Sequence, residues 1–392
     1  MKILTVHNYY QQSGGEDQVF SAESALLQEH GHHVLRYTVH NAQIKRMSST
    51  ALTKATLWNS STHRELRDLV KREKPHVAHF HNTFPLISPA GYYAARAEGV
   101  PVVQTLHNYR LLCSNAQFFR DGHVCEDCLG KTPPWPGIVH ACYRGSRTAS
   151  GVVAAMLTAH RASRTWTEMV DMYVSLTEFQ RQKFIQGGIP EGKIKVKPNF
   201  VRFDPGVGEG SGGYVLFVGR LSTEKGIETL LAAWKRLGGR VPLKIAGDGP
   251  LAGEVARATE ALEDVEWLGR QPEEQVRALM KSARALVFPS VWYEGFPMVI
   301  VEAYAAGLPV IASDLGSMST LVEHGRTGLH FSPGDPKDLA RKIQWSQEHP
   351  SELAMMGKEA RSQFEAKYTA EQNYRMLMEI YELAMEGARG KT

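Results

Sequence analysis

Two cationic side chains, Arg220 and Lys225, lie within one short turn in the second half of the sequence. They follow the apolar run Tyr214–Val218, which reads as a strand, and they precede a helical pattern that opens near Gly226. Gly219 lets the backbone approach a ligand closely, and the free N–H groups of a helix N-terminus attract anions. This combination suits a diphosphate, although an ordinary strand–turn–helix with surface cations would have the same residue pattern.

Two carboxylates, Glu294 and Glu302, follow the apolar strand pattern at Leu286–Phe288. Pro297 fits the first turn of a helix, so Glu294 falls in the loop before that helix and Glu302 inside it. Carboxylates accept hydrogen bonds from sugar hydroxyls. The alternative is a helix-terminal charge and an ordinary solvated Glu. The apolar neighbours of Glu302 argue against it, because a carboxylate in such a setting should be paired.

Strand and helix patterns alternate through the first half of the chain. Asp17–His30 repeats apolar residues with the period of an amphipathic helix, and Gly31 stands where a helix C-terminus favours a left-handed residue. Apolar runs that read as strands surround it at Lys2–His7, Val34–Tyr37, His76–Phe80 and Pro101–Thr105. Such alternation predicts a parallel sheet wrapped by helices.

The alternation restarts after residues 204–213, a glycine-rich segment with the composition of a flexible linker. Strands are predicted at Tyr214–Val218, Leu243–Ala246, Val265–Leu268, Ala285–Phe288, Pro309–Ala312 and Gly328–Phe331. We therefore predict an α/β fold of two Rossmann-like, doubly wound domains facing a central cleft. The N-terminal domain spans 1–203, the C-terminal domain spans 214–350, and helices over 351–392 pack back across both. Ligands bind such sheets at the carboxyl ends of their strands.

Length and composition exclude several classes of protein. The 392 residues suggest two domains, and 43% apolar and 22% charged residues are typical of globular chains. No apolar run reaches the roughly 18 residues that a membrane-spanning helix needs. The first residues enter a strand pattern instead of a signal peptide. A cytoplasmic protein is expected.

The charge is unevenly distributed along the chain. Residues 1–196 hold 22 Lys and Arg against 15 Asp and Glu, together with 13 of the 16 histidines, whereas residues 197–392 hold 23 against 26. Basic residues gather at 45–74, with Trp58 among them. This mix favours either a peripheral contact with the anionic inner face of a membrane or a solvated helix face with one buried edge. No nucleic-acid partner is expected.

The motifs of the second half together resemble the retaining glycosyltransferases of family 4, which have the GT-B architecture. The resemblance covers most of 214–345, with order and spacing preserved through Val218–Gly226, Gly247–Pro250, Phe288–Ser290, Glu294–Glu302, Ala306–Ser313 and Gly325–Phe331. In the first half, Gly14-Gly15 and Thr105–Asn108 match family landmarks more loosely. The chain departs from the family pattern at Asn108, where Asp is usual, and at Ser317, where a second Gly is common. The identity of the sugar therefore stays open.

The resemblance implies roles for individual residues. Arg220 and Lys225 would bind the diphosphate of a nucleotide sugar and stabilise it as the leaving group. Glu302 would hold the ribose hydroxyls, Glu294 would contact the donor sugar near the reacting carbon, and His107 would lie near the transferred sugar. The other donor-binding positions implied are Gly14, Gly15, Gly219, Gly295, Phe296 and the backbone N–H groups of Met298 and Val299.

The implied activity is retaining transfer of a sugar to a hydroxyl of a glycan, a lipid-linked or polysaccharide intermediate, or a small molecule. The departing diphosphate needs positive charge nearby. Another fold supplies it with a metal ion on an Asp-x-Asp motif, which this sequence lacks. We therefore predict metal-independent catalysis without a cofactor.

Two other interpretations stay open. One is a nucleotide-sugar 2-epimerase or a phosphorylase on the same architecture, although no motif for a pyridoxal-binding lysine is evident. The other is a catalytically silent nucleotide-sugar-binding protein, which would be expected to have lost Arg220, Lys225, Glu294 or Glu302.

The four cysteines, Cys113, Cys125, Cys128 and Cys142, fall in a loop-rich insertion at about 109–145. A central C-x2-C flanked by two further thiols resembles a structural zinc site. Reduced or partly paired thiols are the alternative.

Four histidines, His7, His79, His81 and His107, lie at or just beyond the carboxyl ends of predicted strands. They suit either contact with an acceptor and acid–base chemistry, or structural roles at strand ends. The structural role is favoured for all except His107.

Overall fold

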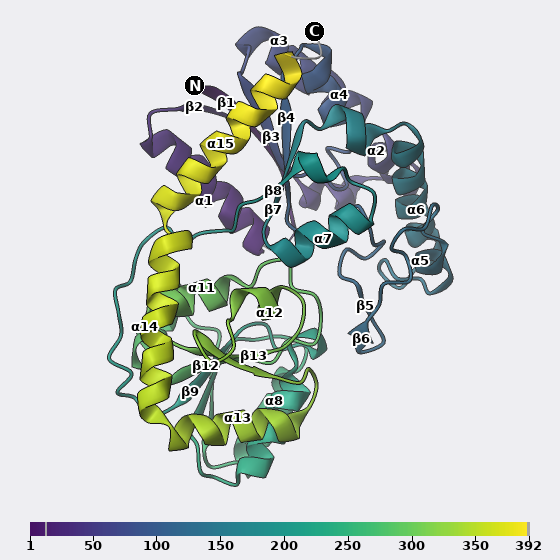
Figure 1. Cartoon of the computed structure of the whole chain (residues 1–392). Coiled ribbons are helices and arrows are strands. Elements are labelled where there is room, and N and C mark those ends of the chain that lie inside the picture. Colours follow the sequence, from purple (N-terminus) through teal and green to yellow (C-terminus); the bar gives the residue numbers. More distant parts are fainter. Residues whose placement is uncertain (12–13, 390–392) are drawn as a thin grey trace. The chain divides into compact units, whose positions relative to one another are not determined.

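The computed structural model describes residues 1–11 and 14–389, and the chain divides into two compact units. Unit 1 comprises Met1–Phe118, Glu126–Asn199 and the chain from Asn373 onward. Unit 2 comprises Phe119–Cys125 and Phe200–Gln372. Each unit is built around its own parallel six-stranded sheet with helices on both faces (Figure 1).

The sheet of unit 1 has the strand order β2-β1-β3-β4-β7-β8. The strands are β1 (Lys2–Tyr9), β2 (His33–His40), β3 (Val77–Asn82), β4 (Val102–Leu106), β7 (Met172–Ser175) and β8 (Ile194–Val196). The strand order reverses between β1 and β3, where Ile3 pairs with Val77. In doubly wound sheets this reversal point, at the carboxyl ends of the strands, is where ligands bind.

Helices of very different length cover the sheet of unit 1. The α-helices are α1 (Gly15–Glu29), α2 (Ser49–Leu57), α3 (Ser60–Glu73), α4 (Ala90–Ala97), α5 (Trp135–Val139), α6 (Arg147–Ala162), α7 (Glu178–Gln186) and α15 (Ala370–Arg389). Short 3-10 turns lie at Asn41–Arg46 and Glu191–Lys193, and a π-helical turn lies at Thr165–Met169. The apolar face of α15, with Leu377, Ile380, Tyr381 and Ala384, packs into the same core as β1, β3, β4 and β7.

The sheet of unit 2 has the strand order β11-β10-β9-β12-β13-β14. The strands are β9 (Val215–Val218), β10 (Leu243–Ala246), β11 (Val265–Gly269), β12 (Ala285–Phe288), β13 (Val310–Ser313) and β14 (Gly328–Phe331). Their residues are almost all apolar and buried, as expected of a parallel sheet covered on both faces. The strand order reverses between β9 and β12.

The helices of unit 2 follow the strands in regular alternation. They are the 3-10 turn η4 (Thr223–Lys225), α8 (Ile227–Leu237), α9 (Ala252–Ala261), α10 (Glu273–Ser282), α11 (Met298–Ala305), α12 (Ser317–Leu321), α13 (Pro336–Glu348) and α14 (Pro350–Lys367). Trp234 of α8 is fully buried, and its indole N–H donates to the Val241 carbonyl at 2.8 Å. Ala360 and Phe364 of α14 pack into the core beside α11.

The strands predicted in unit 2 all form, with ends that agree to within one residue. In unit 1, β1 to β4 form where they were predicted, and β1 and β2 run longer than expected. The prediction missed β7 and β8, which have only four and three residues, and the small antiparallel hairpin of β5 (Phe119–Arg120) and β6 (His123–Val124).

The glycine-rich segment 204–213 packs against the rest of unit 2 through backbone hydrogen bonds. The N–H groups of Gly208, Gly210 and Gly212 donate to the carbonyls of Ala306, Lys281 and Ser282. A Cβ on Gly208 would lie 2.2 Å from the Lys281 carbonyl oxygen. The glycines are therefore needed for close backbone packing, which corrects the expectation of a flexible linker.

Within residues 1–11 and 14–389, no helix has both the length and the apolar character required to cross a bilayer.

Candidate functional site

The sheet order of unit 2 brings the loops after β9 and β12 together. The two strands are neighbours, with Leu216 paired to Leu286, although about 70 residues separate them in the sequence. Beyond the strand ends, the Val291 N–H donates to the Glu224 carbonyl at 3.0 Å. The turn that carries Lys225 and the loop that carries Glu294 are therefore one local structure.

Lys225 and Glu294 form an ion pair in this local structure. The Lys225 ammonium lies 2.6 Å from Glu294 Oε1, which also accepts a hydrogen bond from the Ser290 hydroxyl at 2.5 Å. The ring of Trp292 lies 5.7 Å from the ammonium, within cation–π range. The Glu294 side chain is 7% exposed and that of Lys225 is 21% exposed. The pair keeps a partly accessible cation at the carboxyl edge of the sheet.

Two glycines allow the backbone to pack this closely. Gly226 has φ of 72°, and a Cβ there would lie 2.0 Å from the Pro289 carbonyl oxygen. Gly247 has φ of 152°, and a Cβ there would lie 1.8 Å from the Gly219 carbonyl oxygen. Only glycine combines these conformations with this space. Gly219, which is half-buried and directly follows β9, is held in place by the close packing of Gly247 against its backbone.

The Arg220 side chain is exposed, directly after Gly219. Within the described part of the chain it forms no ion pair or hydrogen bond, whereas Lys225 is held by Glu294. Its guanidinium, which has several N–H donors for phosphate oxygens, is thus uncommitted.

The start of α11 supplies backbone donors close to Glu294. Pro297 precedes the helix, and the N–H groups of Met298 and Val299 fall in its first turn, where a helix offers no carbonyl partner. The Gly295 carbonyl accepts from the Ser317 hydroxyl at 3.3 Å, which ties this loop to α12. Phe296, by contrast, packs its ring on the core against Tyr368, so its side chain has a structural role within the unit.

Glu302 lies within α11 and is half-buried. Burial raises the pKa of Glu302 to about 7, with a further contribution from Glu273 and an opposing one from Arg277. We expected this carboxylate to be paired, but no side chain or backbone group of the described residues bonds to it. A half-buried carboxyl group without a protein partner beside helix N–H groups is suited to hydroxyl groups of a ligand.

A second polar cluster lies at the carboxyl edge of the sheet in unit 1. Glu16, in the first turn of α1, accepts hydrogen bonds from the Asn108 amide at 2.6 Å and from the Tyr10 hydroxyl at 2.9 Å. Burial raises the pKa of Glu16 to about 7 despite these two donors. The sequence analysis missed Glu16 and Tyr10, and the only signal was the position of Glu16 directly after Gly14-Gly15.

A hydrogen bond to Glu16 explains why Asn is present at position 108, where Asp is more usual. Its amide N–H group donates to the Glu16 carboxylate, a role that an ionised Asp cannot fill. Asp at this position would place two carboxylates in hydrogen-bond contact, and this departure from the family pattern therefore goes together with Glu16.

Gly14 and Gly15 open helix α1 beside this cluster. The Gly14 N–H donates to the Asp17 carboxylate at 3.1 Å, while the Asp17 N–H donates back to the Gly14 carbonyl, which caps the helix. Asp17 also accepts from the buried His7 imidazole at 2.7 Å. No atom of the described chain lies within 4 Å of a Cβ built on Gly14 or Gly15, so crowding within the protein does not explain either glycine.

Three side chains, those of Glu23, His79 and His81, form a buried polar network behind His107. His81 lies 3.0 Å from His107, and the Glu23 carboxylate contacts His79 and His81, each at 3.2 Å. His7, His79 and His81 are at most 3% exposed, which fits structural roles and not contact with an acceptor. His107 is half-buried and is the member that ligands can reach.

Glu23, His79 and His81 place three potential metal ligands within 4.8 Å of one another. The Lys197 ammonium, however, lies 2.8 Å from Glu23 Oε2 and is itself 1% exposed. This buried cation already balances the carboxylate charge and would repel a metal ion. The group therefore fits an internal ion-pair network better than a metal site.

The cysteines of the insertion are all thiols in this structure. Cys113 and Cys128 are buried, and Cys125 and Cys142 are half-buried. The Cys113 thiol donates to the Asn115 side chain at 2.9 Å. The zinc site stays a prediction.

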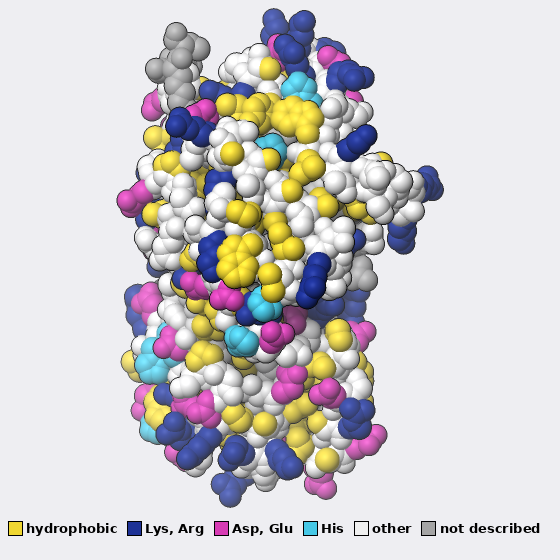
Figure 2. Space-filling view, turned by 90° about the vertical axis from the view of Figure 1, so that its right-hand side faces the viewer, with side chains coloured by type: hydrophobic (Ala, Val, Ile, Leu, Met, Phe, Trp, Pro, Cys, Tyr) yellow, Lys and Arg dark blue, Asp and Glu magenta, His cyan; other side chains and the backbone are white. Residues whose placement is uncertain are grey.

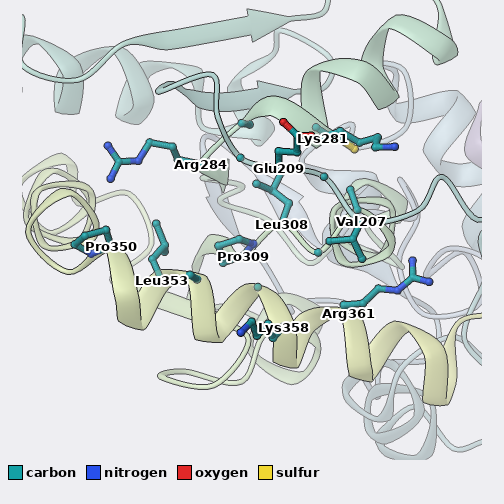
Figure 3. Close-up of a pocket in the computed structure, with 18 residues that line it drawn as sticks. Val207, Glu209, Lys281, Arg284, Leu308, Pro309, Pro350, Leu353, Lys358 and Arg361 are labelled. Carbon is teal, nitrogen blue, oxygen red and sulfur yellow. The ribbon is translucent and has the colours of Figure 1, made fainter.

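A pocket of about 540 Å³ lies elsewhere in unit 2, between α14, the 207–210 segment and the residues that precede β12 and β13 (Figure 3). Its Arg361 is already paired with Asp204 at 2.6 Å, and its Arg284 donates to Gln347. The pocket lies at the amino ends of the strands, the opposite sheet edge from Lys225 and Glu294, and it is therefore separate from the candidate site.

The predicted site residues thus fall into two groups. Unit 2 brings together Lys225 and Glu294 and places Gly219, Arg220, Gly295, Met298, Val299 and Glu302 on the surrounding loops and helix. Gly14, Gly15 and His107 belong to unit 1.

Two family profiles match consecutive parts of the chain. The family described as Glycosyltransferase Family 4 matches residues 3–204, and Glycosyl transferases group 1 matches residues 206–363. Together they cover both sheets and every residue of the candidate site.

Curated relatives align with part of this chain. A D-rhamnosyltransferase, WbpZ of Pseudomonas aeruginosa, is 34% identical over 161 residues, which are 40% of this chain and 42% of the relative. A glycogen synthase of Mycobacterium tuberculosis is 31% identical over 181 residues, 45% of this chain and 44% of the relative. The chain therefore spans about two-fifths of the length of these relatives.

Solved structures share the whole fold. HepE of Anabaena, in complex with UDP, superposes with a TM-score of 0.70 at 18% identity, covering 97% of this chain and 99% of its own. A glycosyltransferase of Rickettsia africae gives a TM-score of 0.73 at 16% identity, covering 98% of each chain. With its two parallel α/β domains, the chain has the GT-B fold.

The raised pKa of Glu302 predicts a pH-dependent stability difference. The folded group binds its proton more tightly than the unfolded group does. Below about pH 4.5 the group is neutral in both states. As the pH rises from about 4.5 through about 7, the unfolded state gives up this proton first, and the folded state loses stability relative to it. Glu302→Gln removes this loss. We expect the variant to be more stable than the wild type by about 1–3 kcal/mol at pH 8 and nearly equal to it at pH 4.5, measured by urea unfolding.

The exposed Glu260 of α9 provides the control, because Glu260→Gln should change stability little at either pH. A Glu302→Gln difference of the same size at pH 4.5 and pH 8 would mean that the pKa of Glu302 is not raised in the folded state.

Proposed function

The chain belongs to glycosyltransferase family 4, and on that basis we propose that it transfers a sugar from a nucleoside diphosphate to an acceptor hydroxyl. The observation that carries the proposal is the Lys225–Glu294 pair at the reversal point of the sheet in unit 2, at 2.6 Å. Strand order, glycine packing and helix N–H groups all converge there.

Lys225 and Arg220 supply the charge that the reaction needs. When the bond between the anomeric carbon and the phosphate oxygen breaks, one further negative charge develops on the diphosphate, which already carries two. The Lys225 ammonium can exchange part of its contact with Glu294 for a contact with a phosphate oxygen. The exposed Arg220 guanidinium can bind a second phosphate oxygen. The N–H groups at the start of α11 favour the same anion.

The two carboxylates have different environments and, in this proposal, different roles. Glu294 is buried and charge-paired, so it fixes Lys225 and can accept a hydrogen bond from a hydroxyl of the donor sugar. Glu302 has no hydrogen-bond partner among residues 1–11 and 14–389, and it would accept hydrogen bonds from the ribose hydroxyls. Ribose binding to its ionised form would lower the pKa that burial has raised.

We propose retention of the anomeric configuration, on the strength of the family resemblance. The acceptor oxygen would attack on the face that the diphosphate leaves, and a phosphate oxygen would take the acceptor proton. The new glycosidic bond then forms as the old bond breaks, without a protein nucleophile. Product analysis distinguishes this reaction from a 2-epimerase, which needs no acceptor.

The acceptor class stays a proposal: a glycan, a lipid-linked or polysaccharide intermediate, or a small molecule. We retain as a further proposal that Cys113, Cys125, Cys128 and Cys142 hold a structural zinc ion that orders the insertion. The donor is the better-supported ligand, because HepE, which has the same fold, was solved with UDP.

Nucleotide binding should depend on Lys225. We expect the best of a panel of UDP-, GDP- and ADP-sugars to raise the melting temperature of the wild type, and Lys225→Ala to weaken its binding about tenfold or more. The exposed Lys235 of α8 lies in the same unit, and Lys235→Ala should bind like the wild type. An unchanged thermal shift in Lys225→Ala would remove the phosphate assignment.

Turnover should not require a divalent metal ion. Because protein cations and helix N–H groups stabilise the leaving diphosphate in this proposal, EDTA should leave the transfer rate within about twofold of its untreated value. Circular dichroism before and after EDTA checks that the chain stays folded. Loss of turnover in folded protein, with recovery on adding magnesium or manganese, would contradict this part of the proposal.

We also propose that unit 1 docks on an anionic membrane. Lys45, Arg46, Lys54 and Arg64 are exposed, and Trp58 at the end of α2 is 39% exposed. Helices α2 and α5 both pack against α6, and α5 exposes Trp135 and Val139 at 53% and 50%. Figure 2 shows a face on which hydrophobic side chains lie among Lys and Arg side chains. Exposed tryptophans among basic residues suit the headgroup region.

Vesicle sedimentation tests this docking surface. The double change Lys54→Ser and Trp58→Ser should weaken binding to vesicles with anionic phosphatidylglycerol about tenfold, with little binding to phosphatidylcholine alone. Phe203, 62% exposed in unit 2, gives the control Phe203→Ser, which should bind like the wild type. Equal binding by all three proteins, or none, would mean that the basic surface is only a solvated helix face.

A further inference from the structure

Three side chains of unit 1 form a line from the half-buried His107 to a buried carboxylate. His107 Nε2 lies 3.0 Å from His81 Nδ1, and the two rings are nearly parallel, with centroids 5.2 Å apart. On its other side, His81 Nε2 lies 3.2 Å from Glu23 Oε1. The three groups come from the loop after β4, from β3 and from α1, so tertiary packing alone assembles them.

Glu23 at the end of this line is ionised. Burial alone would raise its pKa, but Lys197 and His79 outweigh burial and hold the pKa of Glu23 well below its usual range. Lys197 lies 2.8 Å from Oε2, and the Asn373 side chain accepts from the same ammonium at 3.2 Å. An ionised carboxylate accepts hydrogen bonds and cannot donate them.

That carboxylate determines which nitrogen of His81 carries the proton. His81 Nε2 lies 3.2 Å from Glu23 Oε1, outside hydrogen-bond geometry, and neither atom has a hydrogen-bond partner among the described residues. The negative charge of the carboxylate attracts an N–H group and repels a nitrogen lone pair, so it favours the proton on Nε2. Burial and the neighbouring His79 lower the pKa of His81 to about 3, against the opposing effect of Glu23, so His81 is neutral. A neutral imidazole has one N–H, and Nδ1 of His81 is therefore an acceptor.

The same reasoning passes to His107. Its Nε2 faces an acceptor, so Nε2 must carry the proton and donate it to His81. Burial, with smaller contributions from His81 and His7, holds the pKa of His107 well below its usual value, so this ring is neutral too. The Nδ1 atom of His107 then carries a lone pair, and no group in the described part of the chain donates a hydrogen bond to it.

We propose that Glu23 and His81 are positioning residues that fix His107 as a neutral imidazole with its proton on Nε2, so that Nδ1 accepts a hydrogen bond from a hydroxyl of the transferred sugar. This inference rests on the proposed function for the role of His107, but the proton assignment does not. It also narrows the substrate class. A neutral acceptor nitrogen recognises a hydroxyl group and gives no attraction to a carboxylate or phosphate at the same position on the sugar.

Two substitutions of His81 separate its two contacts. The Oδ1 atom of Asn can stand in for Nδ1, so His81→Asn keeps an acceptor for His107 and loses the contact with Glu23. The amide of Gln reaches about as far as Nε2, so His81→Gln keeps a donor to Glu23 and loses the acceptor for His107. Both variants retain a polar side chain, and unfolding curves identify any general loss of stability.

Nitrogen-15 NMR of histidine-labelled protein reads the tautomer of His107 directly, with its signals assigned by their loss in His107→Gln. In the wild type and in His81→Asn we expect the proton on Nε2 of His107. In His81→Gln we expect a mixture of tautomers. A merely structural role for His81 would leave the tautomer of His107 the same in both variants.

Transfer kinetics provide the second readout. We expect His81→Gln to lower kcat/KM for the donor about tenfold or more relative to His81→Asn, while UDP binding stays within about twofold in both. A proton on Nδ1 of His107 in the wild type overturns the inference, whatever the activity of the chain. If the tautomers behave as expected but both variants transfer sugar equally well, the network is confirmed and the proposed role of His107 in sugar recognition is wrong.

Discussion

The part of the candidate site in unit 2 depends on one constraint, the reversal of strand order between β9 and β12. The reversal places two loops from distant parts of the sequence side by side, and each contributes one charge to the Lys225–Glu294 pair. Neither the buried Glu294 nor the half-buried Lys225 would be well tolerated as an isolated charge, because desolvation costs more than an unpaired group can recover. As a pair they stay charged, and the pair remains open enough for a phosphate to share the cation. Gly226 serves this arrangement, since a larger residue there would push the two loops apart, and Gly247 allows the loop after β10 to pack against Gly219.

The two units use buried charge in different ways. In unit 2 the charged groups of the candidate site lie near the surface: in the part of the chain that the structure describes, no group bonds to the Glu302 carboxylate, Arg220 is exposed, and Lys225 pairs with Glu294. In unit 1 the charges of Glu23 and Lys197 are sealed inside the protein and satisfy each other. The first arrangement leaves binding capacity for a ligand. The buried Glu23–Lys197 pair of unit 1 is fixed in place and orients the neutral histidines beside it. Neutral histidines suit the recognition of an uncharged group.

The sequence predicted those parts of the site that local patterns encode. Strand, turn and helix follow each other within a few residues around Lys225 and Glu294, so their positions at the sheet edge could be read directly. The expectation that the Glu302 carboxylate is paired was wrong for the described residues. Apolar neighbours in the sequence indicate that a side chain is buried, but they do not show which groups lie opposite it in the fold. Tyr10, Glu16 and Asn108 meet only through the folded sheet, and no short motif announces their contact. Strands β7 and β8 were missed because three or four residues are too few to show a periodicity.

Helix α15 makes unit 1 discontinuous in the sequence, and this affects how the protein can be divided. Apart from the short segment Phe119–Cys125, the chain enters unit 2 after Asn199 and returns at Asn373. Helix α15 therefore supplies Leu377, Ile380 and Tyr381 to a core whose other members lie before residue 200. Asn373 also accepts from the buried Lys197 ammonium. A fragment ending before α15 would expose that core and leave the Lys197–Glu23 pair short of a partner. A chimaera that exchanges Phe200–Gln372 with the matching part of a relative therefore needs two junctions, one at each end of that segment, to keep both cores whole.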